Sequence, residues 1–292
     1  MSKKAQHFLL NYFKLKDKKY HIVIAYLILF VCLISIYTSC AGENNKKLPE
    51  NIRFSIFGNT LPETPYTAMG IKIETAIIKI NDDNPLFAVH IGDIVCGGGR
   101  WRGIKKNDIE KQYDNFYSIA KNLKPMLYTV IGEMDFFNQS PEIYNIYTKK
   151  KDYYSFNYGN IHFIVLNTAD VSPGEIGKVQ IEWLTEDLDL YKNREAIFIF
   201  THHPLFFPKR EITDQTDVVK DYITLHKLFL KYPVRAVFSG HLPVYYKEEI
   251  DNITYIITGC GDYDKKYNYS KAYQYYIIDY SFGTINILAK RL

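Results

Sequence analysis

Three stretches of the chain share one pattern, a run of apolar residues that ends at a polar one: LFAVHIGDIVCGGG (86–99), AIFIFTHHPLF (196–206) and VRAVFSGHLPVY (234–245). The runs are rich in Val, Ile and Phe, which is typical of buried strands. Glycine or proline accompanies each polar residue, so we expect Asp93, His202 and His241 on the loops that leave these strands. Such loops line the ligand crevice of open α/β sheets. The sequence therefore predicts one shared site whose carboxylate and imidazole groups suit Zn, Mn or Fe.

Strands and helices alternate along most of the remaining chain. The residue patterns predict strands at 51–58, 86–91, 125–132, 196–201 and 234–239, a hairpin at 153–168, and helices at 67–81, 108–122, 178–193 and 216–231. Further strands are expected near the end, at 244–249, 253–258, 273–280 and 283–288. Alternating elements followed by a series of strands favour an α/β fold with two packed sheets and flanking helices.

The first 39 residues have the composition of an export signal. Residues 1–21 carry six lysines and one acidic residue, Asp17, and IVIAYLILFVCLISIYTSC (22–40) is apolar until its small-residue end. Cys40, followed by AGENN, resembles the lipidated cysteine of a bacterial lipoprotein, and an uncleaved signal anchor is the alternative. Both interpretations place the rest outside the cytoplasm and attached to the membrane. We expect residues 40–50 to be a tether and 51–292 to form the domain.

The charge of the chain argues against a nucleic-acid partner. The whole sequence has a formal net charge of +4, but residues 1–39 hold six of the 36 basic residues and only one of the 32 acidic residues. The remainder therefore carries a net charge of −1, which is not the basic footprint of a nucleic-acid-binding domain.

Two cysteines remain in the predicted domain, Cys96 and Cys260, each shortly after a strand-like run. A disulfide is permitted in an exported protein, but spacing alone does not establish its geometry. We therefore treat them as two independent loop thiols. The domain has no CxxC motif, which disfavours a thiol-redox enzyme.

Residues 51–290 resemble the calcineurin-like metallophosphoesterases, nearest the purple acid phosphatase-type branch. The stretches that carry this resemblance are IGDIV (91–95), YYSFNYGNIHFIVLNT (153–168), QIEWLTEDL (180–188), FTHHPLF (200–206), FSGHLPVYYKE (238–248) and YIITGCGD (255–262). The resemblance implies a four-layer αββα sandwich, in which two mixed β-sheets are flanked by helices. It also implies two metal ions at the strand ends.

The ligands that this family uses for its first metal are mostly replaced here. The family motif Gly-Asp-x-His falls on GNTL (58–61), so Asn59 and Leu61 stand at two ligand positions. The motif Gly-His-x-His falls on GHLP (240–243), where Pro243 replaces the last histidine. Of the first-metal set only Asp93, the bridging residue, is kept, with the neutral Asn59 as a weak further candidate.

The ligands of the second metal are kept or exchanged for another ligand. The family motif Gly-Asn-His-Asp/Glu falls on GEMD (132–135), so Glu133 replaces an asparagine and Met134 replaces the proton-donating histidine. The resemblance then implies a metal set of Asp93, Glu133, His202 and His241. Its two carboxylates and two imidazoles balance the charge of one divalent cation, Zn, Mn or Fe.

These substitutions lead to two hypotheses about function. The first is a membrane-tethered phosphoester hydrolase that works with one metal at reduced activity, with His203, Arg100 and Arg102 as substrate-binding residues. The second is a surface protein that keeps the fold for binding a metal or another ligand, without catalysis.

Overall fold

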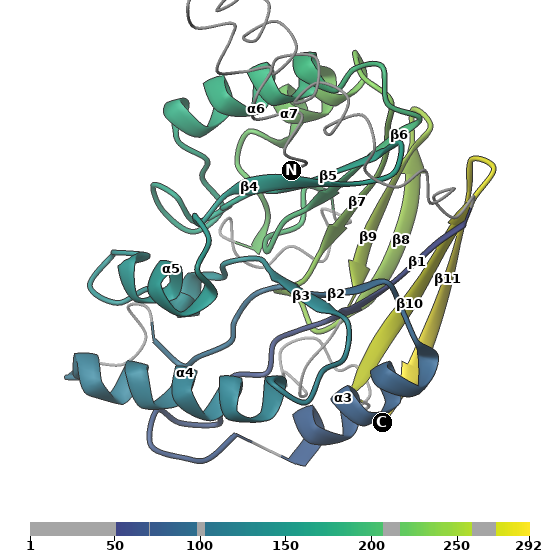
Figure 1. Cartoon of the computed structure of the whole chain (residues 1–292). Helices are drawn as coiled ribbons and strands as arrows, with labels where there is room; N and C mark the ends of the chain where they lie inside the picture. The colour runs from purple at the N-terminus through teal and green to yellow at the C-terminus, as the bar shows by residue number, and fades with distance from the viewer. Residues whose placement is uncertain (1–50, 70, 98–102, 207–216, 259–272) are drawn as a thin grey trace, which may run out of the picture. The chain divides into compact units, whose positions relative to one another are not determined.

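The structure is a computed structural model that describes residues 51–69, 71–97, 103–206, 217–258 and 273–292. Two mixed β-sheets form its centre (Figure 1). The strands of the first sheet lie in the order β11 (Thr284–Arg291), β10 (Gln274–Ser281), β1 (Asn51–Phe57), β2 (Phe87–His90) and β3 (Met126–Thr129). In this sheet β1, β2 and β3 are parallel, whereas β10 and β11 run antiparallel to their neighbours.

The second sheet has six strands and is also mixed. Its order is β4 (Tyr154–Tyr158), β5 (Ile161–Val165), β6 (Ala196–Phe200), β7 (Val234–Ser239), β9 (Ile253–Thr258) and β8 (Tyr245–Ile250). The pairs from β5 to β9 are parallel, and the outer strands β4 and β8 pair antiparallel with their neighbours. The parallel strands matter for function, because their carboxyl ends lie at a common edge.

Helices cover the outer face of each sheet (Figure 1). The helices α3 (Ile71–Asp83) and α4 (Lys106–Ala120) pack on the first sheet, and α6 (Lys178–Leu190) and α7 (Tyr222–Phe229) pack on the second. A short helix, α5 (Glu142–Thr148), and a 3-10 turn, η1 (Glu133–Asp135), complete the described elements. The expected four-layer αββα arrangement is confirmed.

The space between the sheets is filled largely by aromatic side chains. Phe54 of β1 lies 5.7–6.0 Å, centroid to centroid, from four rings of the second sheet: Phe163, Phe198, Phe200 and Phe238. Alternate residues of each strand supply this layer, because successive side chains point to opposite faces of a sheet. The intervening residues of β6, such as Ile197 and Ile199, pack instead against Leu184 of α6 and its neighbours.

The predicted elements agree with the structure, with differences at their ends. The hairpin 153–168 turns at Gly159, whose φ of 60° is readily adopted by glycine. The predicted strand 125–132 is shorter as β3, because the chain leaves the sheet to form η1. The helix α5, which was not predicted, follows Pro141 and ends at Thr148, and the next residue, Lys149, has the left-handed conformation (φ 56°).

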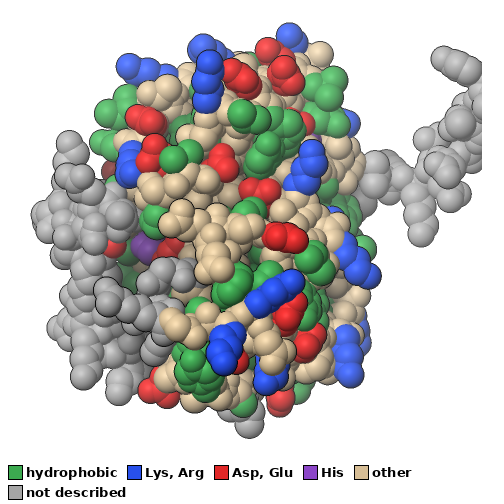
Figure 2. Space-filling view, turned by 90° about the vertical axis from the view of Figure 1, so that its left-hand side faces the viewer, with side chains coloured by type: hydrophobic (Ala, Val, Ile, Leu, Met, Phe, Trp, Pro, Cys, Tyr) green, Lys and Arg blue, Asp and Glu red, His purple; other side chains and the backbone are tan. Residues whose placement is uncertain are grey.

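Several predicted features lie outside the described residues: the export signal, the 40–50 tether with Cys40, Arg100, Arg102 and Cys260. Within the residues that the structure describes, no helix combines the length and apolarity required to cross a membrane. On the face shown in Figure 2, lysine and arginine side chains are interspersed with acidic ones. This mixed surface agrees with the near-neutral charge of the domain.

A buried histidine on β2 supports a test of the packing below the strand ends. His90 is fully buried, with Nε2 2.8 Å from Thr60 Oγ1, and its Nδ1 accepts the N–H of Gly92 (3.3 Å). Burial, with a smaller effect of His202, lowers the pKa of His90 to about 3. Because the unfolded chain binds a proton near its ordinary pKa of about 6.5, folding loses stability as the pH falls from there toward 3.

We predict that His90 makes the fold about 2 kcal/mol less stable at about pH 5 than at about pH 7. Urea unfolding of metal-free protein at the two pH values measures this difference, and His90→Gln should remove most of it. An unchanged pH dependence in the variant would contradict the assignment. Other buried groups contribute equally to both proteins, so the comparison isolates His90.

Candidate metal centre

The predicted site residues do come together at the carboxyl ends of the parallel strands. Asn59 follows β1, Asp93 follows β2, Glu133 begins η1 after β3, His202 follows β6 and His241 follows β7. Backbone hydrogen bonds join neighbouring loops within each sheet, and side-chain hydrogen bonds, such as Asn59 Nδ2 to His241 O (3.3 Å), join loops of different sheets. The N–H of Asn59 donates to Gly92 O (3.0 Å), and the N–H of Gly240 donates to His202 O (3.0 Å).

Three of these residues have an unusual backbone conformation. Asn59, Asp93 and His241 have φ values of 48°, 58° and 60°, in the left-handed region that non-glycine residues rarely adopt. Each such residue costs on the order of 1 kcal/mol and persists where the surroundings enforce it, which is typical of functional sites. Other non-glycine residues with positive φ lie in turns away from the site, but at these three positions the fold holds a candidate site residue in a strained conformation.

Two glycines allow the loops to approach closely. A Cβ atom on Gly92 would lie 2.3 Å from His202 Nδ1, and one on Gly132 would lie 2.2 Å from Asp93 Oδ1. Both distances are far below van der Waals contact. Any side chain at Gly92 or Gly132 would therefore displace a candidate ligand.

The carboxylate of Asp135 holds two of the loops in register. It is fully buried and accepts backbone N–H groups from Gly132 (2.8 Å), Asp93 (2.9 Å), Ile94 (2.7 Å) and Val95 (3.1 Å). Burial and the nearby Asp93 raise the pKa of Asp135 to about 7, and the N–H donors oppose that rise by favouring the ionised form. Asp135 thus fixes Asp93 relative to the start of η1, although it does not face the centre as a ligand.

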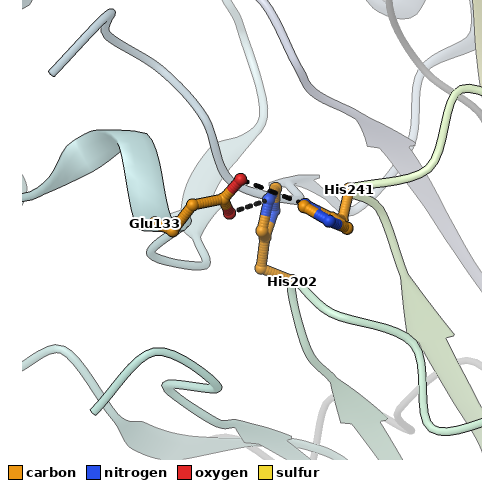
Figure 3. A group of neighbouring side chains, drawn as sticks. All are labelled: Glu133, His202 and His241. Atoms are coloured by element: carbon orange, nitrogen blue, oxygen red, sulfur yellow. Dashed lines mark ion pairs between the residues drawn. The ribbon is translucent and has the colours of Figure 1, made fainter. Parts of the chain in front are cut away.

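The centre itself is formed by Glu133, His202 and His241 (Figure 3). Glu133 Oε2 lies 2.9 Å from His202 Nε2, and Glu133 Oε1 lies 3.1 Å from His241 Nδ1. One potential ligand atom from each residue lies within 4.8 Å of the others. Asp93 Oδ1 lies beside them, 3.4 Å from His202 Nε2. Metal–ligand bonds of about 2.1 Å place neighbouring ligand atoms about 3–3.5 Å apart, so these distances fit one ion.

The tautomer of His202 shows that a metal ion or a proton is needed between its Nε2 atom and the nearby carboxylates. Its Nδ1 lies 2.8 Å from the carbonyl oxygen of Ile91, which only accepts, so Nδ1 carries a hydrogen. In the neutral ring Nε2 then directs a lone pair toward the carboxylates of Asp93 and Glu133. Among the described residues Nε2 and Glu133 Oε2 have no hydrogen-bond partner, although both are buried. A metal ion or a proton must lie between these facing lone pairs, and the donor set fits a divalent metal.

Without a metal, protons stabilise the same arrangement. Burial would lower the pKa of His202, but Asp93 and Glu133 hold it well above its usual value. His241 is affected in the same way, and Glu133 and Asp217 raise its pKa to about 9 against the effect of burial. Burial would raise the pKa of Glu133, yet His241 and His202 hold it well below the usual value. Metal binding must therefore displace protons from these imidazoles.

The other sequence-predicted residues have distinct surroundings. Asn59 donates from Nδ2 to His241 O (3.3 Å), and its buried Oδ1 has no partner among the described residues. His203 is fully buried, and its Nε2 lies 3.5 Å from Glu133 Oε2. Burial, with His241, lowers its pKa well below the ordinary value.

Met134 is buried and donates its backbone N–H to Asp93 Oδ1 (3.1 Å). Cys96 is buried, so its thiol does not lie on the surface.

Sequence reasoning missed two contributors to the centre. Asp217 is buried, with Oδ1 3.9 Å from His241 Nε2, and Thr168 contacts the ring of His203. Thr168 ends the quoted stretch 153–168, but nothing in that stretch singles it out, and Asp217 stands in none of the quoted stretches. Both are distant in sequence from the histidines that they approach. Only the folded arrangement reveals them.

Comparisons with known proteins agree with this geometry. A dimetal phosphatase of Danio rerio is similar in structure (TM-score 0.61, 12% identity), over 82% of this chain and 96% of that one. A purple acid phosphatase of yellow lupin, Lupinus luteus, follows (TM-score 0.60, 14% identity), over 82% of this chain and 51% of that one. GAP50, the anchor in the inner membrane complex of Plasmodium, has a TM-score of 0.57 at 16% identity, over 83% of this chain and 84% of that one.

At these identities the structural likeness establishes the fold alone. A sequence comparison with curated proteins gives no match. Residues 72–245, more than half of the chain, match the profile of the family described as Calcineurin-like phosphoesterase. With its paired mixed sheets, its flanking helices and its His/Glu metal-binding group, the chain belongs to the calcineurin-like metallophosphoesterase family.

Proposed function

We propose that this protein is a phosphoester hydrolase that uses a single divalent metal ion and works more slowly than relatives with two. The observation that carries the proposal is the convergence of Glu133, His202 and His241, whose potential ligand atoms lie within 4.8 Å of one another. With Asp93, these residues would hold the ion. A divalent cation bound there supplies Lewis-acid polarisation of a phosphoryl oxygen.

The neighbouring positions support one ion rather than two. Where the family pattern has an aspartate and two histidines, this chain has Asn59, Leu61 and Pro243, none of which is charged. Asn59 already uses its amide N–H to bind the His241 carbonyl, which leaves only Oδ1 facing the loops. A second ion would therefore lack the anionic ligands that offset its desolvation.

The reaction also lacks the usual proton donor. Met134 stands where the family has a histidine, and its thioether carries no proton. Proton transfer to the leaving oxygen is generally worth about 10²–10⁴ in rate. This loss favours a slow hydrolase, and it equally favours a second candidate function, the binding of a metal or phosphoester ligand without catalysis.

We predict one zinc or manganese ion per chain after loading and gel filtration, measured by elemental analysis. Glu133→Ala and His202→Ala should each reduce the metal retained after gel filtration, because each removes one of the four proposed ligands. Glu182→Ala, an exposed glutamate of α6, is the control and should retain the full amount. Two tightly held ions in the unaltered protein would refute the one-metal proposal.

We predict metal-dependent hydrolysis of an aryl phosphate at a rate below the ordinary enzyme range of about 1–10³ per second. The triple variant Asn59→Asp, Leu61→His, Pro243→His should bind a second ion and hydrolyse faster, since a second positive charge stabilises the transition state. Each single change should have little effect. A wild-type rate within the ordinary range would contradict the proposal, and a complete absence of hydrolysis with metal bound would favour the binding function.

We further propose that the domain lies outside the cytoplasm, tethered to a membrane through lipidated Cys40, with a phosphoester as its small-molecule partner and no nucleic-acid partner. The support is the basic and apolar composition of residues 1–39 and the small residues before Cys40. We predict that Cys40→Ala abolishes metabolic labelling with a fatty acid. Labelling that persists in the variant would exclude Cys40 as the lipidation site and favour the uncleaved signal anchor.

A further inference from the structure

Two adjacent histidines approach the same carboxylate oxygen from different directions. His202 Nε2 lies 2.9 Å and His203 Nε2 lies 3.5 Å from Glu133 Oε2, and the two imidazole planes are nearly perpendicular (89°). Both side chains are fully buried, and neither Nε2 atom has a hydrogen-bond partner among the described residues. The role of each ring therefore depends on which of its nitrogens carries the hydrogen.

The partner of His203 determines its tautomer. Thr168 Oγ1 accepts the backbone N–H of His203 (3.0 Å) and lies 2.8 Å from His203 Nδ1. Thr168 is fully buried, and the structure gives its hydroxyl no other hydrogen-bond partner within the described residues. If Nδ1 were protonated, the buried hydroxyl hydrogen would be left without an acceptor, which is unfavourable. Donation from Thr168 to Nδ1 satisfies both groups and places the ring hydrogen on Nε2.

His202 has the opposite tautomer. Its Nδ1 faces the carbonyl of Ile91 (2.8 Å), which only accepts, so the hydrogen lies on Nδ1 and the lone pair on Nε2. His202 therefore presents an electron pair to the centre, as a metal ligand must. His203 presents an N–H group to the same carboxylate. This difference agrees with the membership of the metal-binding group, which includes His202 and not His203.

We propose that His203 is a positioning residue whose Nε2–H orients the Glu133 carboxylate toward the metal, and that it is not itself a ligand. The proposal rests on the metal site of the proposed function, but not on hydrolysis. At 3.5 Å the contact is longer than most hydrogen bonds, so the proposal requires His203 Nε2 and Glu133 Oε2 to lie closer together in the metal-bound protein.

The presence of Glu133 where the family has asparagine explains why an N–H donor such as His203 Nε2 is needed here. A glutamate has one more methylene group than asparagine and a second anionic oxygen, so both its orientation and its charge need a partner. Oε1 faces His241 (3.1 Å), and Oε2 faces the two adjacent histidines. Ligating carboxylates are commonly held by such hydrogen bonds, and their loss typically weakens metal binding about 10- to 100-fold.

Long-range ¹H–¹⁵N NMR of the histidine rings in zinc-loaded protein tests the tautomers directly. We expect His203 to show a protonated Nε2 and an unprotonated Nδ1, and His202 to show the reverse, with zinc on Nε2. An unprotonated or zinc-bound Nε2 in His203 would overturn the proposal. The spectrum of His203 can also be recorded without metal. If zinc does not bind, the proposed function is refuted, and the metal-free spectrum still shows which nitrogen of His203 is protonated.

Two variants of similar length separate a donor from a ligand. The glutamine side chain in His203→Gln keeps an amide N–H group near the position of Nε2, so this variant should bind zinc within about threefold of wild type. His203→Met lacks any donor and should bind zinc about 10- to 100-fold more weakly. The control is His226→Gln, a buried histidine that contacts Tyr255 and Asp251 instead of the centre.

Equal and large losses in both His203 variants would indicate a ligand and overturn the proposal, as would unchanged affinity in His203→Met. Thermal unfolding confirms that each variant is folded. If the methionine variant does not fold, the NMR spectrum of the wild-type protein decides between the two roles.

Discussion

The site depends on one buried carboxylate that bonds only to the backbone. Asp135 accepts N–H groups from Gly132 and from three consecutive residues that begin at Asp93. Those N–H groups belong to loops that have left their strands, so no sheet partner satisfies them. Asp135 replaces the missing partners and fixes the position of Asp93 relative to Glu133. The positive φ of Asp93 and the absence of a side chain at Gly132 follow from the same close approach.

Electrostatic balance within the centre explains how the site tolerates its substitutions. Glu133 adds a negative charge beside Asp93, and two imidazoles whose pKa values are raised face these carboxylates. The group can therefore be neutralised by a divalent metal or by protons. Asn59 stands where the family motifs have an aspartate, and Leu61 and Pro243 stand where they have histidines. The position of a second metal ion therefore lacks comparable ligands. This difference between a charged group and neutral or apolar positions is the reason for proposing a single ion.

The fold could be predicted from the sequence because its elements have strong local patterns. Runs such as FAVH at 87–90 and AIFIF at 196–200 are buried on both faces. Their residues alternate between the layer that separates the two sheets and the layer between each sheet and its helices. The ends of elements were less predictable. The strand β3 stops at Thr129 because the chain must turn toward Asp135, a tertiary constraint that its apolar continuation at Val130 and Ile131 does not reveal. The helix α5 is short, and its sequence EIYNIYT has too few turns to show a clear period.

The sequence by itself determined which residues are available at the strand ends: Asp93, Glu133, His202 and His241 in positions to meet, and Met134 without a proton to donate. Asp93, His202 and His241 follow from the pattern, since a strand followed by glycine or proline places the next polar residue on a loop. Glu133 and Met134 follow only from the resemblance to the family. Only the tertiary structure decided what adjacent residues do. His202 and His203 are neighbours of the same type, yet one faces the Ile91 carbonyl and the other the Thr168 hydroxyl. The tautomer of an imidazole is set by the partner across the fold, and that partner is 111 residues away for His202 and 35 for His203.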